Sequence, residues 1–260
     1  MFKFSRKVAL ITGGTQGMGS VTAEALAGAG ASVVICGRDL EKGEKTAAEL
    51  TAKTGKEVRF LCSDISDAES VKRLVEKIVA DYGRLDLAFN NAGVTSEHAC
   101  VADASVANWQ RTININVNGT FHAMKYEIAA MLNSGGGAIV NNSSVLGLTP
   151  ISGQAAYCAS KAAILALTKG AAMEYARAEG RPRIRINAVA PGPILGGMNN
   201  EAHLARNPAS TQRKLDLTAM HRFGTPEEVV TSVLFLLSEE SSYITGAVIP
   251  VDGGASAGKF

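Results

Sequence analysis

Short, mainly apolar runs alternate with longer amphipathic segments along the whole of this chain. The runs are Val8–Ile11, Ser32–Cys36, Val58–Cys62, Leu85–Phe89, Ala138–Asn142, Ile184–Ala190 and Ala247–Val251. Runs of this kind are typical of strands that are buried on both faces of a parallel sheet. Because helix-like segments separate them and no linker or repeat intervenes, the sequence predicts one α/β domain over residues 1–260. Its core would be a doubly wound parallel sheet of about seven strands.

Capping residues predict where several helices begin. Ser66, with Glu69 three residues later, has the pattern of a capping box and is expected to open a helix that ends near Tyr82. Thr225 is expected to cap another helix, because a proline and two glutamates follow it. Longer helices are predicted over Ser105–Leu132 and Gln154–Ala178. The polar segment 196–217 between them and the last strand is predicted to be a mobile lid over the substrate.

The composition excludes several classes of protein. Of the 260 residues, 46% are hydrophobic and 19% are charged, with a net charge of +2, which argues against a disordered chain. No basic patch with interleaved aromatic residues occurs, so no nucleic-acid partner is expected. No apolar run approaches the roughly 20 residues of a membrane helix, and the N-terminus lacks the pattern of a signal peptide. No membrane association is therefore expected.

The cysteines indicate neither a disulfide framework nor a metal site. Cys36, Cys62, Cys100 and Cys158 are widely spaced, with no CxxC pair and no histidine placed to complete a zinc site. No metal is therefore expected. Free thiols are typical of a reducing compartment, so the protein is expected in the cytoplasm.

A glycine-rich turn follows the first predicted strand directly. Residues 12–19 read TGGTQGMG, and an alanine-rich segment continues to about Ala29. The order of strand, glycine-rich turn and helix suits a dinucleotide phosphate, because glycines allow close backbone approach and the helix N-terminus offers free N–H groups. The spacing differs from GxGxxG, and a merely tight turn is the alternative. The pattern favours a Rossmann sheet, whose ligands bind at the carboxyl ends of the strands.

The end of the second predicted strand bears on the choice between NADP and NAD. In a dinucleotide fold an acidic residue there favours a free 2′-hydroxyl on the adenosine ribose, whereas an arginine favours a 2′-phosphate. Neither Cys36 nor Gly37 is acidic, and Arg38 follows them, so NADP(H) is favoured. Asp39 comes next, and NAD(H) therefore stays possible.

The segment from Ser144 to Lys161 contains a hydroxyl, a phenol and an ammonium that one reaction could use. Tyr157 and Lys161 are four residues apart in an alanine-rich stretch, so they are expected on one face of a helix. A nearby cation lowers the pKa of a phenol, which is otherwise about 10, and would suit Tyr157 to proton transfer near neutral pH. A packed tyrosine beside a solvated lysine is the alternative.

Several motifs, in order, make the chain resemble the short-chain dehydrogenase/reductase family. They are TGGTQGMG from Thr12, Asp64-Ile65, NNAG from Asn90, NVNG from Asn116, Ser143-Ser144, YCASK from Tyr157 and Pro191-Gly192. The resemblance covers nearly the whole chain. Within the family, the chain is similar to the 3-oxoacyl-carrier-protein reductases and to related carbonyl reductases and alcohol dehydrogenases. It implies an NAD(P)-dependent oxidoreductase that transfers a hydride between the nicotinamide and a ketone or secondary alcohol.

The resemblance also implies a role for each matching residue. Tyr157 would be the general acid or base, Ser144 would orient the substrate oxygen, and Lys161 would hold the nicotinamide ribose and lower the pKa of Tyr157. Asn116 would anchor a water that continues the proton relay. The implied cofactor contacts are Gly13, Thr15, Gln16, Gly17, Met18, Gly19, Arg38, Asp64, Ile65, Asn91, Ala92, Gly93, Tyr157, Lys161, Pro191, Gly192 and Ile194.

Two positions depart from the pattern of the family. Where the family often has a threonine five residues after Pro191, this chain has Gly196, so one cofactor contact is lost or the lid is rebuilt. Where NADP-using members often have a basic residue before the second motif glycine, this chain has Gln16. Use of NADP(H) is therefore expected to depend on Arg38.

The substrate and the assembly stay open. The small-molecule substrate would be a 3-oxoacyl thioester, a sugar, a cyclic or steroid-like ketone, or a small ketone. A basic cluster could steer an acidic carrier protein or could be only an exposed helix end; it consists of Arg177, Arg181, Arg183 and Arg185. The alternative functions are a non-catalytic NAD(P)-sensing protein and a dehydratase or epimerase of the same fold. The family's interfaces predict a homo-oligomer, a tetramer in preference to a dimer.

Overall fold

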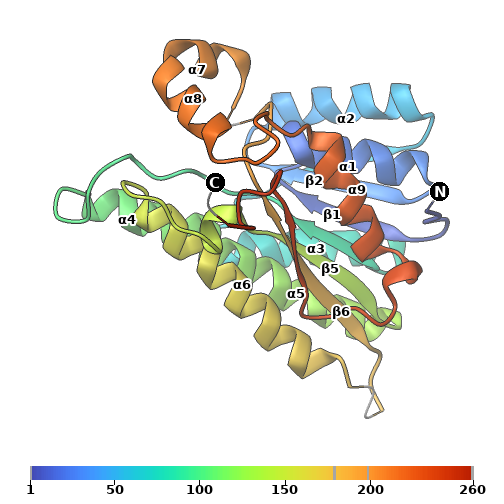
Figure 1. Ribbon diagram of the computed structural model, residues 1–260. Coiled ribbons are helices and arrows are strands. Elements are labelled where there is room, and N and C mark those ends of the chain that lie inside the picture. Colours follow the sequence, from blue (N-terminus) through green and yellow to red (C-terminus); the bar gives the residue numbers. More distant parts are fainter. Residues whose placement is uncertain (1, 178–179, 198, 259–260) are drawn as a thin grey trace.

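A parallel β-sheet forms the centre of the molecule (Figure 1). The computed structural model describes residues 2–177, 180–197 and 199–258. Within these residues the sheet has seven strands in the order β3-β2-β1-β4-β5-β6-β7, and every neighbouring pair is parallel. The strands are β1 (Val8–Thr12), β2 (Ser32–Gly37), β3 (Val58–Cys62), β4 (Leu87–Asn90), β5 (Gly137–Asn142), β6 (Ile184–Pro191) and β7 (Val248–Val251). The predicted doubly wound sheet is confirmed.

Helices cover both faces of this sheet. The elements on one face are α1 (Gly17–Gly28), α2 (Leu40–Thr54) and α9 (Pro226–Leu237), and those on the other face are α3 (Ala68–Tyr82), α5 (Gly119–Ser134) and α6 (Ala155–Tyr175). Successive strand residues point to opposite faces. Ala9 and Ile11 of β1 therefore pack against the first group of helices, while Val8 and Leu10 pack against the second. The continuous apolar runs follow from this two-sided burial.

Two helix starts test the predicted capping residues. Thr225 is the N-cap of α9, as predicted, and it also forms a capping box with Glu228. The prediction for α3 was wrong, because Asp67 is the N-cap and its carboxylate accepts the backbone N–H of Glu69 at 3.0 Å. The hydroxyl of Ser66 instead donates to Asp64 Oδ1 at 2.7 Å. Both residues suit an N-cap, and the contact with Asp64 decides between them.

The single helix predicted over 105–132 is interrupted in the structure. It consists of α4 (Val106–Ile113), a π-helical turn (Asn114–Asn118) and α5 (Gly119–Ser134). Turns of this type add a residue to the helical repeat and occur frequently at functional sites. Here the turn contains Asn116, whose side chain is fully buried.

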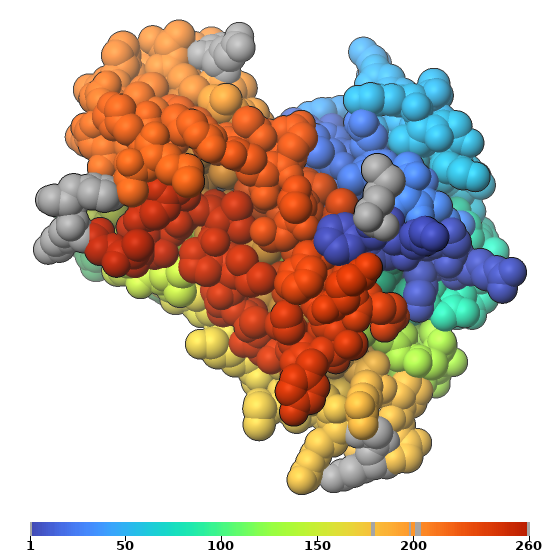
Figure 2. Space-filling model, turned by 45° about the vertical axis from the view of Figure 1, so that its right-hand side comes forward, coloured from blue at the N-terminus to red at the C-terminus, as the bar shows by residue number. Residues whose placement is uncertain are grey.

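The predicted lid segment, 196–217, contains two short helices, α7 (Glu201–Arg206) and α8 (Pro208–Asp216). They project from the body of the molecule beyond the sheet (Figure 1). Figure 2 shows a notch between these lid helices, in orange, and the N-terminal part of the chain, in blue. The lid therefore stands over one end of the sheet.

Candidate active site

A cavity of about 310 Å³ opens at the carboxyl ends of the central strands. This position is where ligands bind in doubly wound sheets, because the strand order reverses between β1 and β4. Among the predicted catalytic and cofactor residues, those that line the cavity are Gly13, Thr15, Gln16, Gly17, Met18, Arg38, Asp64, Ile65, Asn91, Ala92, Gly93, Ser144, Tyr157, Lys161, Pro191, Gly192 and Ile194. Gly19 and Asn116 lie behind its wall.

The glycine-rich turn has the shape that a dinucleotide phosphate requires. Gly13 and Gly17 have φ angles of +63° and +56°, which side chains rarely adopt. A Cβ at Gly13 would lie 2.9 Å from the Cα of Ala92, and one at Gly17 would point across the cavity toward Gly197, 3.6 Å away. Side chains here would fill the cradle, so the turn fits a diphosphate held by backbone N–H groups.

Gly19 allows close packing at the start of α1, and its predicted contact with the cofactor stays a prediction. A Cβ at this position would lie 2.3 Å from the carbonyl oxygen of Gly13 and 2.7 Å from Nδ2 of Asn91. The absence of a side chain lets α1 pack closely on the turn, which is the third glycine's role in dinucleotide folds.

The end of β4 connects the glycine-rich turn to β5. Thr12 Oγ1 accepts the backbone N–H groups of Asn91 and Ala92, at 3.0 and 3.1 Å. The side chain of Asn91 donates to the Gly13 carbonyl at 3.0 Å and accepts from Asn142 Nδ2 at 3.1 Å. Its amide group is thus bonded to protein, and Asn91 shapes the cavity wall. The buried Oδ1 of Asn142 has no partner among the described residues and borders the same cavity.

Ser144, Tyr157 and Lys161 meet at one side of the cavity. Ser144 follows β5, and its Oγ accepts the N–H of Leu146 at 3.1 Å. Tyr157 and Lys161 lie one turn apart on α6. The Lys161 ammonium is 5.6 Å from the centre of the Tyr157 ring and donates to the Asn142 carbonyl at 2.8 Å. The two candidate proton-transfer groups thus share a helix face.

The protonation equilibria differ from the expectation that Lys161 lowers the pKa of Tyr157. Burial raises the pKa of Tyr157 to about 12, although the hydroxyl of Ser144 acts in the opposite direction. Burial also lowers the pKa of Lys161 to about 8. The Lys161 ammonium is directed to the Asn142 carbonyl, and desolvation dominates at the phenol. In this structure Tyr157 is therefore a protonated donor at neutral pH.

Asn116 holds the loop after β4 against α6. Its Oδ1 accepts the N–H of Val94 at 2.8 Å, and its Nδ2 donates to the Val94 carbonyl at 2.9 Å and to Ser160 Oγ at 3.0 Å. A Cβ at Gly93 would lie 3.2 Å from Asn116 Oδ1 and 3.6 Å from Lys161 Nζ, so both polar groups border one point. The contacts show a positioning role, and the water that Asn116 was predicted to anchor stays a prediction.

The end of the cavity beside β2 is bordered by charged groups. Arg38 is exposed at the end of β2, and its Nη1 lies 4.0 Å from Asp64 Oδ2. Asp39, which left the cofactor choice open in the sequence, is the N-cap of α2 and accepts the N–H of Lys42 at 3.0 Å. Its carboxylate is therefore engaged with the helix.

The cavity is also lined by residues outside the predicted site. They are Cys36, Gly37, Ser63, Val94, Ile115, Asn142, Ser143, Leu195, Gly196, Gly197 and Asn199. Four of them, Ser63, Val94, Ile115 and Asn142, directly adjoin a recognised motif, so extending each motif by one residue would have found them. Asn199 has no such signal in the sequence.

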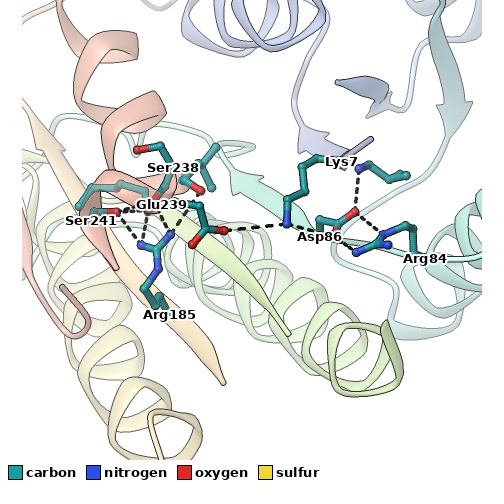
Figure 3. Close-up of polar contacts among 10 residues, drawn as sticks. Lys7, Arg84, Asp86, Arg185, Ser238, Glu239 and Ser241 are labelled. Atoms are coloured by element: carbon teal, nitrogen blue, oxygen red, sulfur yellow. Dashed lines mark hydrogen bonds and ion pairs between the residues drawn. The ribbon is translucent and has the colours of Figure 1, made fainter. Parts of the chain in front are cut away.

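Arg185 belongs neither to an exposed helix end nor to a carrier-docking surface, the two alternatives left open for the basic cluster, because it lies in β6 and its guanidinium is bonded within the protein. Figure 3 shows its guanidinium directed at the C-terminal end of α9. It donates to the carbonyls of Leu236, Leu237 and Ser238 at 2.6, 3.3 and 2.8 Å, and to Ser241 Oγ at 2.7 Å. The free carbonyls of a helix end attract a cation in this way.

A second polar group beside it, also in Figure 3, joins the amino ends of β1 and β4. Asp86 is buried, accepts the N–H of Val8 at 2.9 Å and pairs with Arg84. Lys7 lies 3.8 Å from Asp86 and 3.9 Å from Glu239. These groups are at the opposite end of the strands from the cavity and hold the sheet rather than a ligand.

The described residues contain neither a clustered metal site nor a membrane-spanning helix. No group of three or more His, Cys, Asp or Glu side chains in that part of the chain is arranged to hold a metal ion. Nor is any helix there long and apolar enough to cross a membrane.

Residues 13–256 match a family model described as enoyl-(acyl carrier protein) reductase. Cyclohexanol dehydrogenase of Acinetobacter sp. is 41% identical over 251 residues, which is 96% of this chain and 95% of that protein. The 3-oxoacyl-(acyl-carrier-protein) reductase FabG of Thermotoga maritima is 39% identical over 95% of this chain and 97% of its own length.

Solved structures give the same fold. Levodione reductase superposes with a TM-score of 0.91 at 33% identity, over 98% of this chain and 99% of that one. NAD⁺-bound xylitol dehydrogenase superposes with a TM-score of 0.89 at 34% identity, over 97% of this chain and 100% of the other.

Proposed function

Since the chain belongs to the short-chain dehydrogenase/reductase family and is an NAD(P)-dependent oxidoreductase, we propose that it interconverts a ketone and a secondary alcohol with NADP(H). The observation that supports this most is the arrangement of Ser144, Tyr157 and Lys161 beside the glycine-rich turn in one cavity. A hydroxyl, a protonated phenol and a buried ammonium are the groups that a carbonyl reduction needs. A cofactor-sensing protein would have no use for the complete set.

The proposed mechanism divides the work between cofactor and protein. The bound nicotinamide supplies the hydride chemistry. Ser144 orients the substrate oxygen by hydrogen bonding and stabilises negative charge that develops on it. Tyr157 then donates its proton to that oxygen, and in alcohol oxidation the deprotonated phenol accepts it. Lys161 would hold the nicotinamide ribose, and its positive charge would favour the phenolate once the ammonium turns from the Asn142 carbonyl.

The choice of NADP(H) over NAD(H) is supported by the residues at the end of β2 and directly after it. Arg38 borders the adenosine end of the cavity, and neither Cys36 nor Gly37 supplies an acid for a 2′-hydroxyl. Asp39 is engaged as the N-cap of α2. Positive charge at this end suits a 2′-phosphate.

The substrate is proposed to be an uncharged ketone or alcohol, with a small ring as the first candidate. The cavity that Ser144 and Tyr157 line is also bordered by the apolar residues Val94, Ile194 and Leu195. The related proteins named for their substrates include cyclohexanol dehydrogenase and levodione reductase. Closure of the segment 196–217 over the substrate would shield it from water.

Assembly and location are proposed on weaker features. Large apolar side chains are exposed on α4, α5 and α6, namely Val106, Trp109, Phe121 and Met173. Such exposure favours burial between copies of this chain in a homotetramer, and a monomeric mass by light scattering would exclude it. Cys62 and Cys100 are exposed free thiols, which supports the cytoplasm as the location.

Absorbance at the reduced nicotinamide band tests the proposal directly. NADPH and NADH are each offered with cyclohexanone, a cyclic diketone, a 3-oxoacyl thioester and a keto sugar. Consumption of NADPH in preference to NADH, with the cyclic ketones reduced fastest, is the expected result. Tyr157→Phe is the control, since it keeps the ring and removes the proton. Turnover by that variant at the normal rate would overturn the mechanism, and turnover without net cofactor oxidation would indicate a dehydratase or epimerase.

A further inference from the structure

Lys42 lies beside the cofactor cavity, although it is in no motif of the sequence. It occupies the first turn of α2, is exposed, and its ammonium donates a hydrogen bond to Oε1 of Gln16. Gln16 belongs to the glycine-rich turn and lines the cavity. A cation from α2 is thus held at the position where the turn itself has no basic residue.

The two cations at this end of the cavity, Arg38 and Lys42, differ in their partners. Arg38 has a carboxylate partner, because its Nη1 lies 4.0 Å from Asp64 Oδ2. Lys42 contacts the uncharged amide of Gln16, and the neighbouring Asp39 carboxylate accepts its backbone N–H rather than its ammonium. A phosphate monoester carries close to two negative charges at neutral pH, more than one partly neutralised arginine balances.

We propose that Lys42 is a second cationic ligand of the 2′-phosphate of NADP(H), acting with Arg38, and that it sets the cofactor preference. The inference rests on the proposed use of NADP(H). Arg38 immediately follows β2, and Lys42 lies four residues later on the first turn of α2, so both cations are at the carboxyl end of the same strand. Gln16 reaches Lys42 from the turn after the neighbouring strand β1, and places the ammonium at the cavity wall. The N-terminus of α2 adds the positive end of its dipole.

Binding of adenosine fragments tests this without any turnover. Calorimetric titrations compare 2′,5′-ADP, which has the 2′-phosphate, with 5′-ADP, which lacks it. Lys42→Ala is expected to raise the dissociation constant of 2′,5′-ADP about tenfold, which is the effect of one charge-assisted hydrogen bond at an exposed site. The dissociation constant of 5′-ADP should change by less than about twofold. Lys42→Arg should restore the binding. Lys45→Ala is the matched control, because Lys45 is also exposed on α2, one turn farther along the helix.

The outcomes separate this inference from the proposed function. If wild-type protein prefers 2′,5′-ADP and Lys42→Ala keeps that preference in full, Lys42 is no ligand and the use of NADP(H) stands. An equal loss from Lys42→Ala and Lys45→Ala would likewise overturn the inference, since it would report only the net charge of α2. If wild-type protein binds the two nucleotides equally, the proposed preference for NADP(H) is refuted, and the proposed role of Lys42 is refuted with it.

Discussion

Glu127 is a buried carboxyl group that makes the stability of this fold depend on pH. It lies on α5 with no exposed surface, and its Oε2 accepts a hydrogen bond from Asn90 Nδ2 at 2.9 Å. The same amide donates to Asn141 Oδ1 at 3.0 Å. Glu127 Oε1 and Asn90 Oδ1 have no partner within the described part of the chain. Burial raises the pKa of Glu127 from 4.5 to about 7.

The sign and size of the effect follow from proton linkage. The folded state binds the Glu127 proton more tightly than the unfolded chain does, so the free energy of unfolding falls as pH rises from about 4.5 to about 7. Each pKa unit corresponds to about 1.4 kcal/mol, so a shift from 4.5 to about 7 costs roughly 3 kcal/mol above neutral pH. Below the unfolded pKa this cost is absent.

Glu127→Gln should remove the dependence, because the amide stays neutral and its NH₂ group can donate to Asn90 Oδ1. Urea unfolding at a fixed protein concentration, from pH 5 to pH 8, compares wild type with this variant. The variant is expected to gain stability relative to wild type as pH rises, by up to about 3 kcal/mol at pH 8. Glu49→Gln, an exposed change on α2, is the matched control. Parallel profiles for wild type and Glu127→Gln would refute the reasoning.

Three further substitutions test the site. Tyr157→Phe should reduce turnover by orders of magnitude while cofactor binding, followed by nicotinamide fluorescence, persists; loss of both would make Tyr157 structural. Gly19→Ala should lower the free energy of unfolding, measured with urea, by about 2 kcal/mol or more, because its Cβ would lie 2.3 Å from the Gly13 carbonyl oxygen. The same change should weaken cofactor binding. Arg38→Ala should raise the dissociation constant of NADPH selectively, and an equal change for NADH would show that Arg38 only supports the fold.

The strands could be predicted from the sequence because burial on both faces leaves continuous apolar runs. The boundary of β4 moved from Leu85 to Leu87, since Asp86 precedes the strand and bonds to Val8 instead. The π-helical turn was not predicted; its residue Asn116 makes hydrogen bonds to Val94, in a different segment, which the pattern of one helix does not reveal. The periodicity of apolar residues indicates which side of a helix is buried. It did not reveal that one turn of the helix contains an additional residue.

The site divides in the same way. The site residues that belong to a motif could be identified, because the residues of one motif are adjacent in the sequence and are expected to contact the same part of a ligand. Lys42 and Asn199 were not, since their positions depend on contacts between segments: Lys42 with Gln16, and Asn199 through hydrogen bonds to Lys214 and Ile194. The pKa of Tyr157 in this structure also depends on more than the spacing along α6. Helical spacing places Lys161 near the phenol, whereas desolvation and the direction of the ammonium decide the protonation.

The end of β4 connects the features that sequence reasoning treated separately. Asn90 bonds to Glu127, Asn91 bonds to the glycine-rich turn, and Val94 is held by Asn116 of the π-helical turn. A single short segment thus sets the position of the glycine-rich turn relative to α6. Charging Glu127 places a buried negative charge against the first residue of this segment. Its destabilising effect should therefore reach cofactor binding and turnover together, rather than either one alone.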